Sequence, residues 1–129
     1  MKTKLPPERE RSIQKTGIAT LALLGIVLHR RNVGGFEDDY GHWVQFADAG
    51  QADTYGWDVR TGRHWEIEWK RPGNRPTPAQ LDWLRECTRL GAVAFWCDSV
   101  AIAERVAAAI LKGGKIVWLE GDAYNVRMP

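Results

Sequence analysis

The sequence has few cysteines, no long hydrophobic run and no strong net charge. Two cysteines, Cys87 and Cys97, are too few for a disulfide framework and favour a reducing compartment. The longest apolar run, residues 18–28, is shorter than the roughly 20 residues that a membrane-spanning helix needs. We find no internal repeat, no low-complexity segment and no pattern typical of a signal peptide. We therefore expect a soluble intracellular protein.

What the sequence does contain is typical of one globular domain. Its 129 residues fit a single domain, and a composition of 44% hydrophobic and 26% charged residues argues against disordered and fibrous classes. The net charge of +2 hides segregation, because residues 1–31 carry +5, residues 32–58 carry six acids and no Lys or Arg, and residues 60–75 carry +3. Such segregation fits a metal centre beside a polyanion track, and it equally fits a solvated surface with clustered signs.

Periodicity, turn residues and capping signals predict an α/β domain around a mixed sheet. Helices are expected at residues 6–24 and 77–90 and from Ser99 to a stop at residues 113–114. Strands are expected at residues 26–31, 42–46, 52–59, 64–70, 92–97 and, as the last strand, 115–119. Residues 32–41 read as a turn and an acidic loop, and residues 71–76 as a Pro/Gly-rich loop. The expected organisation is a basic tail (1–7), a domain (8–120) and a C-terminal tail (121–129).

The predicted hairpin at residues 52–70 holds the residues most informative about chemistry. Side chains alternate along a strand, so Glu66, Glu68 and Lys70 share one face, while the hydrophobic residues between them share the other and should pack on a helix. Asp53 on the adjacent strand can join the first face. Carboxylate oxygens suit Mg²⁺ or Mn²⁺, and a nearby lysine can orient water or offset charge on a phosphate. The same pattern also fits a surface hairpin with ordinary cross-strand charge pairs.

Two residues on the predicted helices can extend this constellation. Glu10 shares the helix face of Ile13 and Gln14, and an inward glutamate is costly to bury unless it binds something. Gln80 lies on the apolar side of its helix, but the spacing from Thr77 is also that of a capping box. Both roles remain open for Gln80 at this point.

The order of these residues resembles a known nuclease family. Asp53, followed after fourteen residues by Glu68-Trp69-Lys70, is similar to the D-(x)n-E-x-K core of the PD-(D/E)xK nuclease superfamily. A longer series of elements, over roughly residues 8–111, resembles the VRR-NUC family: ERSIQ at 10–14, RNVG at 31–34, GQAD at 50–53, EWK at 68–70, TPAQ at 77–80, WL at 83–84 and Gly91.

The resemblance implies a restriction-endonuclease-like domain, a mixed sheet flanked by helices, which hydrolyses DNA with Mg²⁺ or Mn²⁺. The catalytic residues that it implies are Glu10, Asp53, Glu68, Lys70 and Gln80. The metal ligands would be Glu10, Asp53, Glu68 and the carbonyl of Trp69. Lys70 would position the attacking water or stabilise the transition state, and Gln80 would support the metal ligands.

The resemblance also implies partners. Short stand-alone members look like Holliday junction resolvases, so we expect a homodimer that acts on branched DNA. The compact form resembles members carried by phages, which suggests a bacterial cytoplasm, and the short apolar run suggests no membrane association. The residues that we expect to contact DNA flank the predicted site, and they are Arg30, Arg31, Asn32, Arg71, Asn74 and Arg75.

Some residues and functions stay open. The tryptophans can stack on unpaired bases, but spacing assigns most of them to the core, and only Trp43 and Trp57 have no assigned place. His42 and His64 can bind metal or DNA, although lone histidines in such positions more often do neither. Two rivals to the endonuclease are a catalytically silent DNA-binding protein on the same fold and a protein that recruits or inhibits another nucleic-acid enzyme.

Overall fold

In the part of the chain that the structure describes, a helix is followed by five successive strands, and two further helices separate the remaining strands. The computed structural model describes residues 9–32, 34–45 and 50–129. The elements in this part of the chain are α1 (Glu10–Leu23), β1 (Ile26–Arg30), β2 (Gly35–Glu37), β3 (Trp43–Gln45), β4 (Thr54–Asp58), β5 (His64–Trp69), α2 (Pro78–Arg89), β6 (Val93–Cys97), α3 (Val100–Leu111), β7 (Lys115–Trp118) and β8 (Tyr124–Arg127). The predicted start of the first helix at residues 6–8 lies outside the described residues.

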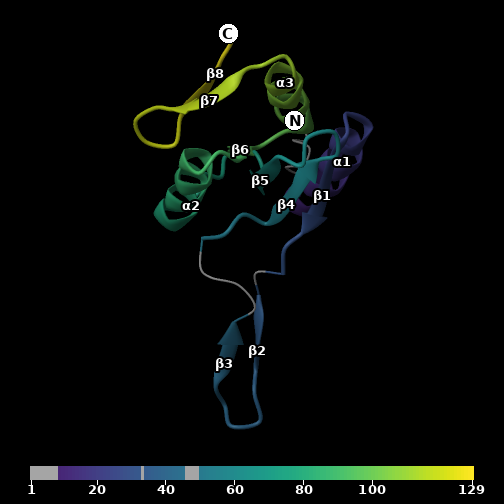
Figure 1. Ribbon diagram of the computed structural model, residues 1–129. Helices are drawn as coiled ribbons and strands as arrows, with labels where there is room; N and C mark the ends of the chain where they lie inside the picture. The colour runs from purple at the N-terminus through teal and green to yellow at the C-terminus, as the bar shows by residue number, and fades with distance from the viewer. Residues whose placement is uncertain (1–8, 33, 46–49) are drawn as a thin grey trace, which may run out of the picture.

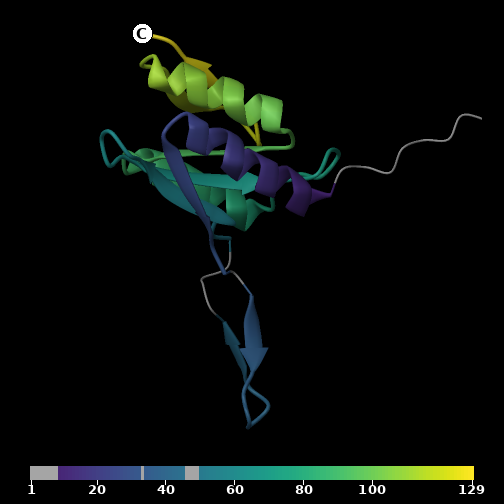
Figure 2. The ribbon, with the colours of Figure 1, turned by 90° about the vertical axis from the view of Figure 1, so that its right-hand side faces the viewer.

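The central sheet has the order β1-β4-β5-β6. Strands β1, β4 and β5 pair antiparallel, whereas β5 and β6 pair parallel, with α2 as the connection that parallel strands require. Figures 1 and 2 show α1 and α3 on one side of this sheet and α2 on the other. The predicted α/β architecture around a mixed sheet is confirmed. Among the described residues, no helix is long and apolar enough to cross a membrane.

The side chains of β5 alternate between the two faces of the sheet, as the sequence pattern predicted. Trp65, Ile67 and Trp69 are buried in the main core together with residues of α1 and α3. Gly17 allows α1 to approach this face closely, because a Cβ atom there would lie 2.1 Å from the ring of Trp69. The Trp69 indole N–H donates to the hydroxyl of Thr54 at 2.9 Å, which satisfies its buried polar atom. This packing fixes the position of α1 against the end of β5.

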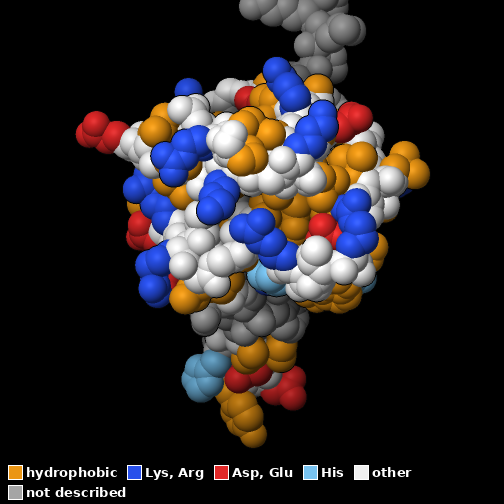
Figure 3. Space-filling model, turned by 45° about the horizontal axis from the view of Figure 1, so that its top comes forward, with side chains coloured by type: hydrophobic (Ala, Val, Ile, Leu, Met, Phe, Trp, Pro, Cys, Tyr) orange, Lys and Arg blue, Asp and Glu red, His pale blue; other side chains and the backbone are white. Residues whose placement is uncertain are grey.

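Residues 35–37, within the segment predicted as a turn and an acidic loop, form strand β2, so the prediction is wrong for these residues. β2 pairs antiparallel with β3, and this hairpin, here called the arm (residues 34–45), projects away from the body of the molecule (Figures 1 and 2). Its turn is stabilised by Asp38, which accepts the N–H groups of Tyr40 and His42 at 2.9 and 2.8 Å. Glycines and acids have low strand propensity, which is why the pattern favoured a loop. Figure 3 shows acidic and hydrophobic side chains at the end of the arm.

The C-terminal segment is also more ordered than the sequence indicated. β8 pairs antiparallel with β7, so the prediction that residues 115–119 form the last strand is wrong. The Tyr124 hydroxyl donates to the carbonyl of Trp96 at 2.5 Å and attaches β8 to the body. The Trp96 indole N–H in turn donates to the carbonyl of Asp122 at 2.8 Å. These contacts join residues 122–127, within the segment predicted as a C-terminal tail, to the body of the molecule.

Candidate metal centre

Three carboxylates from three elements meet at one end of the sheet. They belong to Glu10 in the first turn of α1, Asp53 immediately before β4, and Glu68 in β5, and each offers an oxygen within 4.8 Å of the others. The β4–β5 register, in which Thr54 lies opposite Ile67, brings Asp53 beside Glu68. The packing of α1 on the core brings Glu10 to the same point. The structure thus brings together the three carboxylates predicted as metal ligands.

A ring of hydrogen bonds fixes the orientation of these carboxylates. The Asp53 N–H donates to Glu68 Oε2 at 3.0 Å, and the Trp69 N–H donates to Asp53 Oδ1 at 3.2 Å. The Gln14 amide donates to Asp53 Oδ2 at 2.9 Å. Gln14 was not among the predicted site residues, although its position one turn after Glu10 on the same helix face was a usable signal.

Burial disfavours the ionised forms of Asp53 and Glu68. Burial, together with the charge of Glu68, raises the pKa of Asp53 from 3.8 to about 8. Burial also raises the pKa of Glu68, against the opposing effect of the Lys70 ammonium, whose Nζ lies 3.4 Å from Glu68 Oε1. A divalent cation would compensate this charge, and an all-oxygen donor set suits Mg²⁺ or Mn²⁺. The residues present therefore fit such an ion.

Gln80 makes both of the contacts that its sequence position allowed. Its backbone N–H donates to the Thr77 hydroxyl at 3.2 Å, and its side-chain oxygen accepts the Thr77 N–H at 2.9 Å, which completes a capping box at the start of α2. The remaining end of the same amide donates to Glu68 Oε1 at 2.9 Å. The cap thus holds the Gln80 amide in place for its bond to Glu68.

Trp69 contributes to this centre through its backbone. Its indole lies in the core, and its N–H donates to Asp53. The role of its carbonyl as a further metal ligand stays a prediction.

Glu66, two residues before Glu68 on the same strand face, has a separate set of partners. Its fully buried carboxylate accepts hydrogen bonds from both terminal nitrogens of Arg31, at 2.5 and 2.9 Å, and from the indole N–H of Trp83 at 2.7 Å. Its Oε2 also lies 2.6 Å from His64 Nε2. The charge of Glu66 is thereby neutralised outside the metal-binding group. Arg31, a predicted DNA contact, thus has its guanidinium bound to Glu66. The same guanidinium also donates to the carbonyl of Ala52, the residue before Asp53, at 2.8 Å.

The other predicted DNA contacts lie on the surface. Exposed side chains that surround the sheet end are those of Arg30, Asn32, Arg71 and Asn74. Arg75 is exposed as well and forms an ion pair with Asp122 at 3.0 Å. Their contact with DNA stays a prediction.

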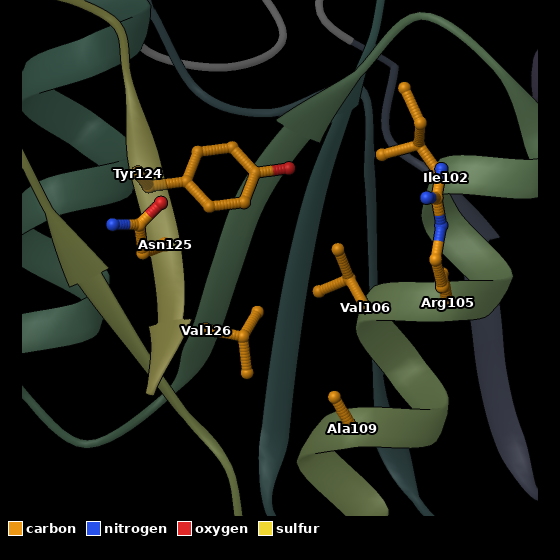
Figure 4. Close-up of a pocket in the computed structure, with 7 residues that line it drawn as sticks. All are labelled: Ile102, Arg105, Val106, Ala109, Tyr124, Asn125 and Val126. Carbon is orange, nitrogen blue, oxygen red and sulfur yellow. The ribbon is translucent and has the colours of Figure 1, made fainter. Parts of the chain in front are cut away.

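A further hollow lies away from this centre. It has a volume of about 370 Å³ and lies between α3 and β8 (Figure 4). Its lining consists mainly of Ile102, Val106, Ala109, Tyr124 and Val126, with Arg105 at its rim. Its lining includes no carboxylate, so it does not resemble the carboxylate cluster at the sheet end.

Comparison with known proteins does not identify a family for this chain. No family model matches the chain, and no curated protein or solved structure is similar enough to it to count as a match.

Proposed function

We propose that this protein is a Mg²⁺- or Mn²⁺-dependent endodeoxyribonuclease of the VRR-NUC family, with the restriction-endonuclease-like fold which that family implies. The observation that carries the proposal is the convergence of Glu10, Asp53 and Glu68 within 4.8 Å, with Lys70 beside them. Three carboxylates and a lysine at a partly open sheet end are the groups that phosphodiester hydrolysis with a hard cation requires.

The residues of the centre have three proposed roles: metal ligands, a positively charged side chain, and a residue that orients a ligand. Glu10, Asp53 and Glu68 would hold the metal ion, which when bound acts as a Lewis acid on a phosphate oxygen and lowers the pKa of water. The Lys70 ammonium, 3.4 Å from Glu68, would orient the attacking water and offset charge that develops on the phosphate. Gln80 holds the carboxylate of Glu68 through a hydrogen bond and thereby restricts its rotamers.

The substrate side of the proposal is DNA, with branched DNA preferred over plain duplex. Arg71 and Asn74 are exposed directly after Lys70, where they can contact phosphates that flank the scissile bond. A homodimer would present two such centres to two strands of a four-way junction. A bacterial cytoplasm, in a host cell or a free-living bacterium, is the proposed location.

The test is gel-resolved cleavage of a labelled four-way junction, with linear duplex and single strand beside it. Each substrate is incubated with Mg²⁺, Mn²⁺ or chelator, and with wild type, Asp53→Ala or the control Asp82→Ala, which changes an exposed carboxylate on α2. We expect cleavage that disappears with chelator and in Asp53→Ala but persists in Asp82→Ala. Paired nicks in opposite arms would support the dimeric resolvase.

Two results would contradict the proposal. Cleavage by the folded Asp53→Ala variant at the wild-type rate would refute the site. DNA binding without cleavage by the folded wild type in either metal would favour a catalytically silent DNA-binding protein.

A further inference from the structure

In the part of the chain that the structure describes, α2 covers the β5–β6 half of the sheet face that carries Asp53 and Glu68, and no helix covers the β1–β4 half. α2 packs on β5 and β6, on the side where Leu84 and Ala94 are buried. Side chains alternate along β4, so Tyr55 and Trp57 point to the same face as Asp53. On the neighbouring β1, His29 lies opposite Tyr55. We call His29, Tyr55 and Trp57 the aromatic platform.

The aromatic platform is an ordered surface of rings in contact with one another. The ring centroid of His29 lies 5.5 Å from that of Trp57 and 5.9 Å from that of Tyr55. The Arg31 guanidinium lies 4.7 Å from the Tyr55 centroid while it is bound to Glu66, so Tyr55 is held from its other side. Trp57 nevertheless remains 42% exposed and His29 is exposed. The tryptophan therefore presents an indole to solvent on a rigid support.

The position of the aromatic platform relative to the metal centre is set by the strand. Tyr55 and Trp57 follow Asp53 by two and four residues, which corresponds to roughly 7 and 14 Å along β4. That distance equals about two to four stacked bases at about 3.4 Å per base. A strand of DNA with its phosphate at Asp53 can therefore reach Trp57 with its next few bases.

Beyond Asp53 and Glu68, this face carries no unpaired carboxylate among the described residues, so its charge does not repel a polyanion there. The residues of β1, β4 and β5 that share the face beyond Asp53 and Glu68 are Val27, His29, Arg31, Tyr55, Trp57, His64 and Glu66. Glu66 is the carboxylate among these described positions, and it is fully buried and paired with Arg31. A groove of about 460 Å³ between the β4–β5 turn and α2 continues the surface, with Arg63 and His64 in its wall. Exposed rings beside cationic groups are the features that bind single-stranded nucleic acid.

We propose that the aromatic platform binds unpaired bases next to the scissile phosphate, so that the preferred substrate is DNA with a single-stranded segment beside the cleavage site. The inference rests on the proposed nuclease function and adds the substrate class. Unpaired bases are required because bases inside a duplex have both ring faces covered by their neighbours.

The direct test measures binding in chelator, where no cleavage occurs. Affinities for a short oligothymidine, a duplex of the same length and an abasic oligonucleotide are compared at one fixed salt concentration. Wild type is compared with Trp57→Ala, Trp57→Phe and the control Trp43→Ala, which removes an indole 66% exposed on the arm. Circular dichroism establishes that each variant is folded.

We expect Trp57→Ala to weaken oligothymidine binding by about 5- to 150-fold, the ratio that corresponds to about 1–3 kcal/mol of stacking per base. Trp57→Phe should retain most of the affinity, because it keeps a ring face, and Trp43→Ala should have the wild-type affinity. Binding of the abasic oligonucleotide should be equally weak in wild type and Trp57→Ala. Unchanged oligothymidine affinity in Trp57→Ala would overturn the proposal.

Two further measurements separate this inference from the nuclease proposal. If wild type cleaves DNA but Trp57→Ala keeps the same preference for a single-stranded flap over plain duplex, the inference fails and the nuclease stands. If no substrate is cleaved but Trp57→Ala loses oligothymidine binding, the nuclease fails and the platform stands. A drop in oligomeric state of Trp57→Ala in sedimentation, with DNA affinity unchanged, would assign the platform to a second copy of the chain and overturn the inference.

Discussion

Replacing Asp53 by Asn should stabilise the metal-free protein at alkaline pH while it abolishes activity. The substitution preserves the local hydrogen bonds, because Asn Oδ1 can accept the Trp69 N–H and the Gln14 amide can rotate to accept from the new Nδ2. It removes one of three carboxylates that lie within 4.8 Å of one another. The expected gain in stability is therefore electrostatic.

The size and sign of this effect follow from the pKa of Asp53. Burial raises that pKa from 3.8 to about 8, so between these values the unfolded chain has released a proton that the folded chain keeps. The free energy of unfolding then falls as pH rises through this range, by at most about 1.4 kcal/mol per pH unit and about 6 kcal/mol altogether. Because Glu68 shares the repulsion and can take up the proton instead, we expect about half of this, roughly 2–4 kcal/mol, to be recovered in the variant.

The assay is chemical denaturation of wild type and Asp53→Asn in chelator at about pH 5, 7 and 9. The two curves should lie closest together at the lowest pH and separate further as pH rises towards 8, with the variant the more stable. Saturating Mg²⁺ should then stabilise the wild type much more than the variant, because ligand binding to the folded state adds to its stability. Equal pH dependence in the two proteins, or equal stabilisation by Mg²⁺, would refute the argument that the carboxylates form an undercompensated metal centre.

Two other predictions concern the supports of the centre. Gln80→Ala should raise the Mg²⁺ concentration for half-maximal cleavage about tenfold or more because Glu68 loses a hydrogen bond. Thr77→Ala should cost about 1 kcal/mol of stability and leave that concentration unchanged, because the backbone N–H of residue 77 still holds the Gln80 side-chain oxygen. A metal titration of both variants checks this, and equal shifts would contradict it. Gly17→Ala should destabilise the protein by about 1–3 kcal/mol, despite the better helix propensity of alanine, because the new Cβ overlaps the ring of Trp69; denaturation measures it, and a stable variant would show that α1 can move.

The central elements of the fold and the inward positions of Glu10 and Glu68 could be predicted because they depend on local periodicity. Alternation along β5 separated Glu68 from Trp69, and that alternation holds whatever the strand pairs with. The inward position of Glu10 followed from helical spacing alone. Gln80 could be placed in its capping box from the four-residue motif, but its bond to Glu68 depends on how α2 packs across the sheet.

The missed elements depend on contacts that are distant in the chain or carry weak local signals. β2 is a three-residue strand that begins with glycine and is followed by Asp38 and Asp39, so its strand character comes from pairing with β3. β8 is held by β7 and by the bond from Tyr124 to Trp96, across 28 residues. Neither pairing can be deduced from a propensity for extended structure in segments this short.

The distinction between Glu66 and Glu68 is the point at which structure adds most to the functional argument. The two carboxylates occupy equivalent positions on one strand face, so strand alternation treats them alike, and it was the resemblance to the E-x-K motif that singled out Glu68. Arg31, from the end of β1, pairs with Glu66 through two nitrogens, whereas Glu68 faces Asp53 and shares the single ammonium of Lys70. The fold therefore neutralises one buried carboxylate fully and leaves its neighbour in a group with more negative than positive charge. Such a group is costly to retain unless a cation completes it, and this imbalance is the physical reason to look for a metal ion at Glu68 rather than at Glu66.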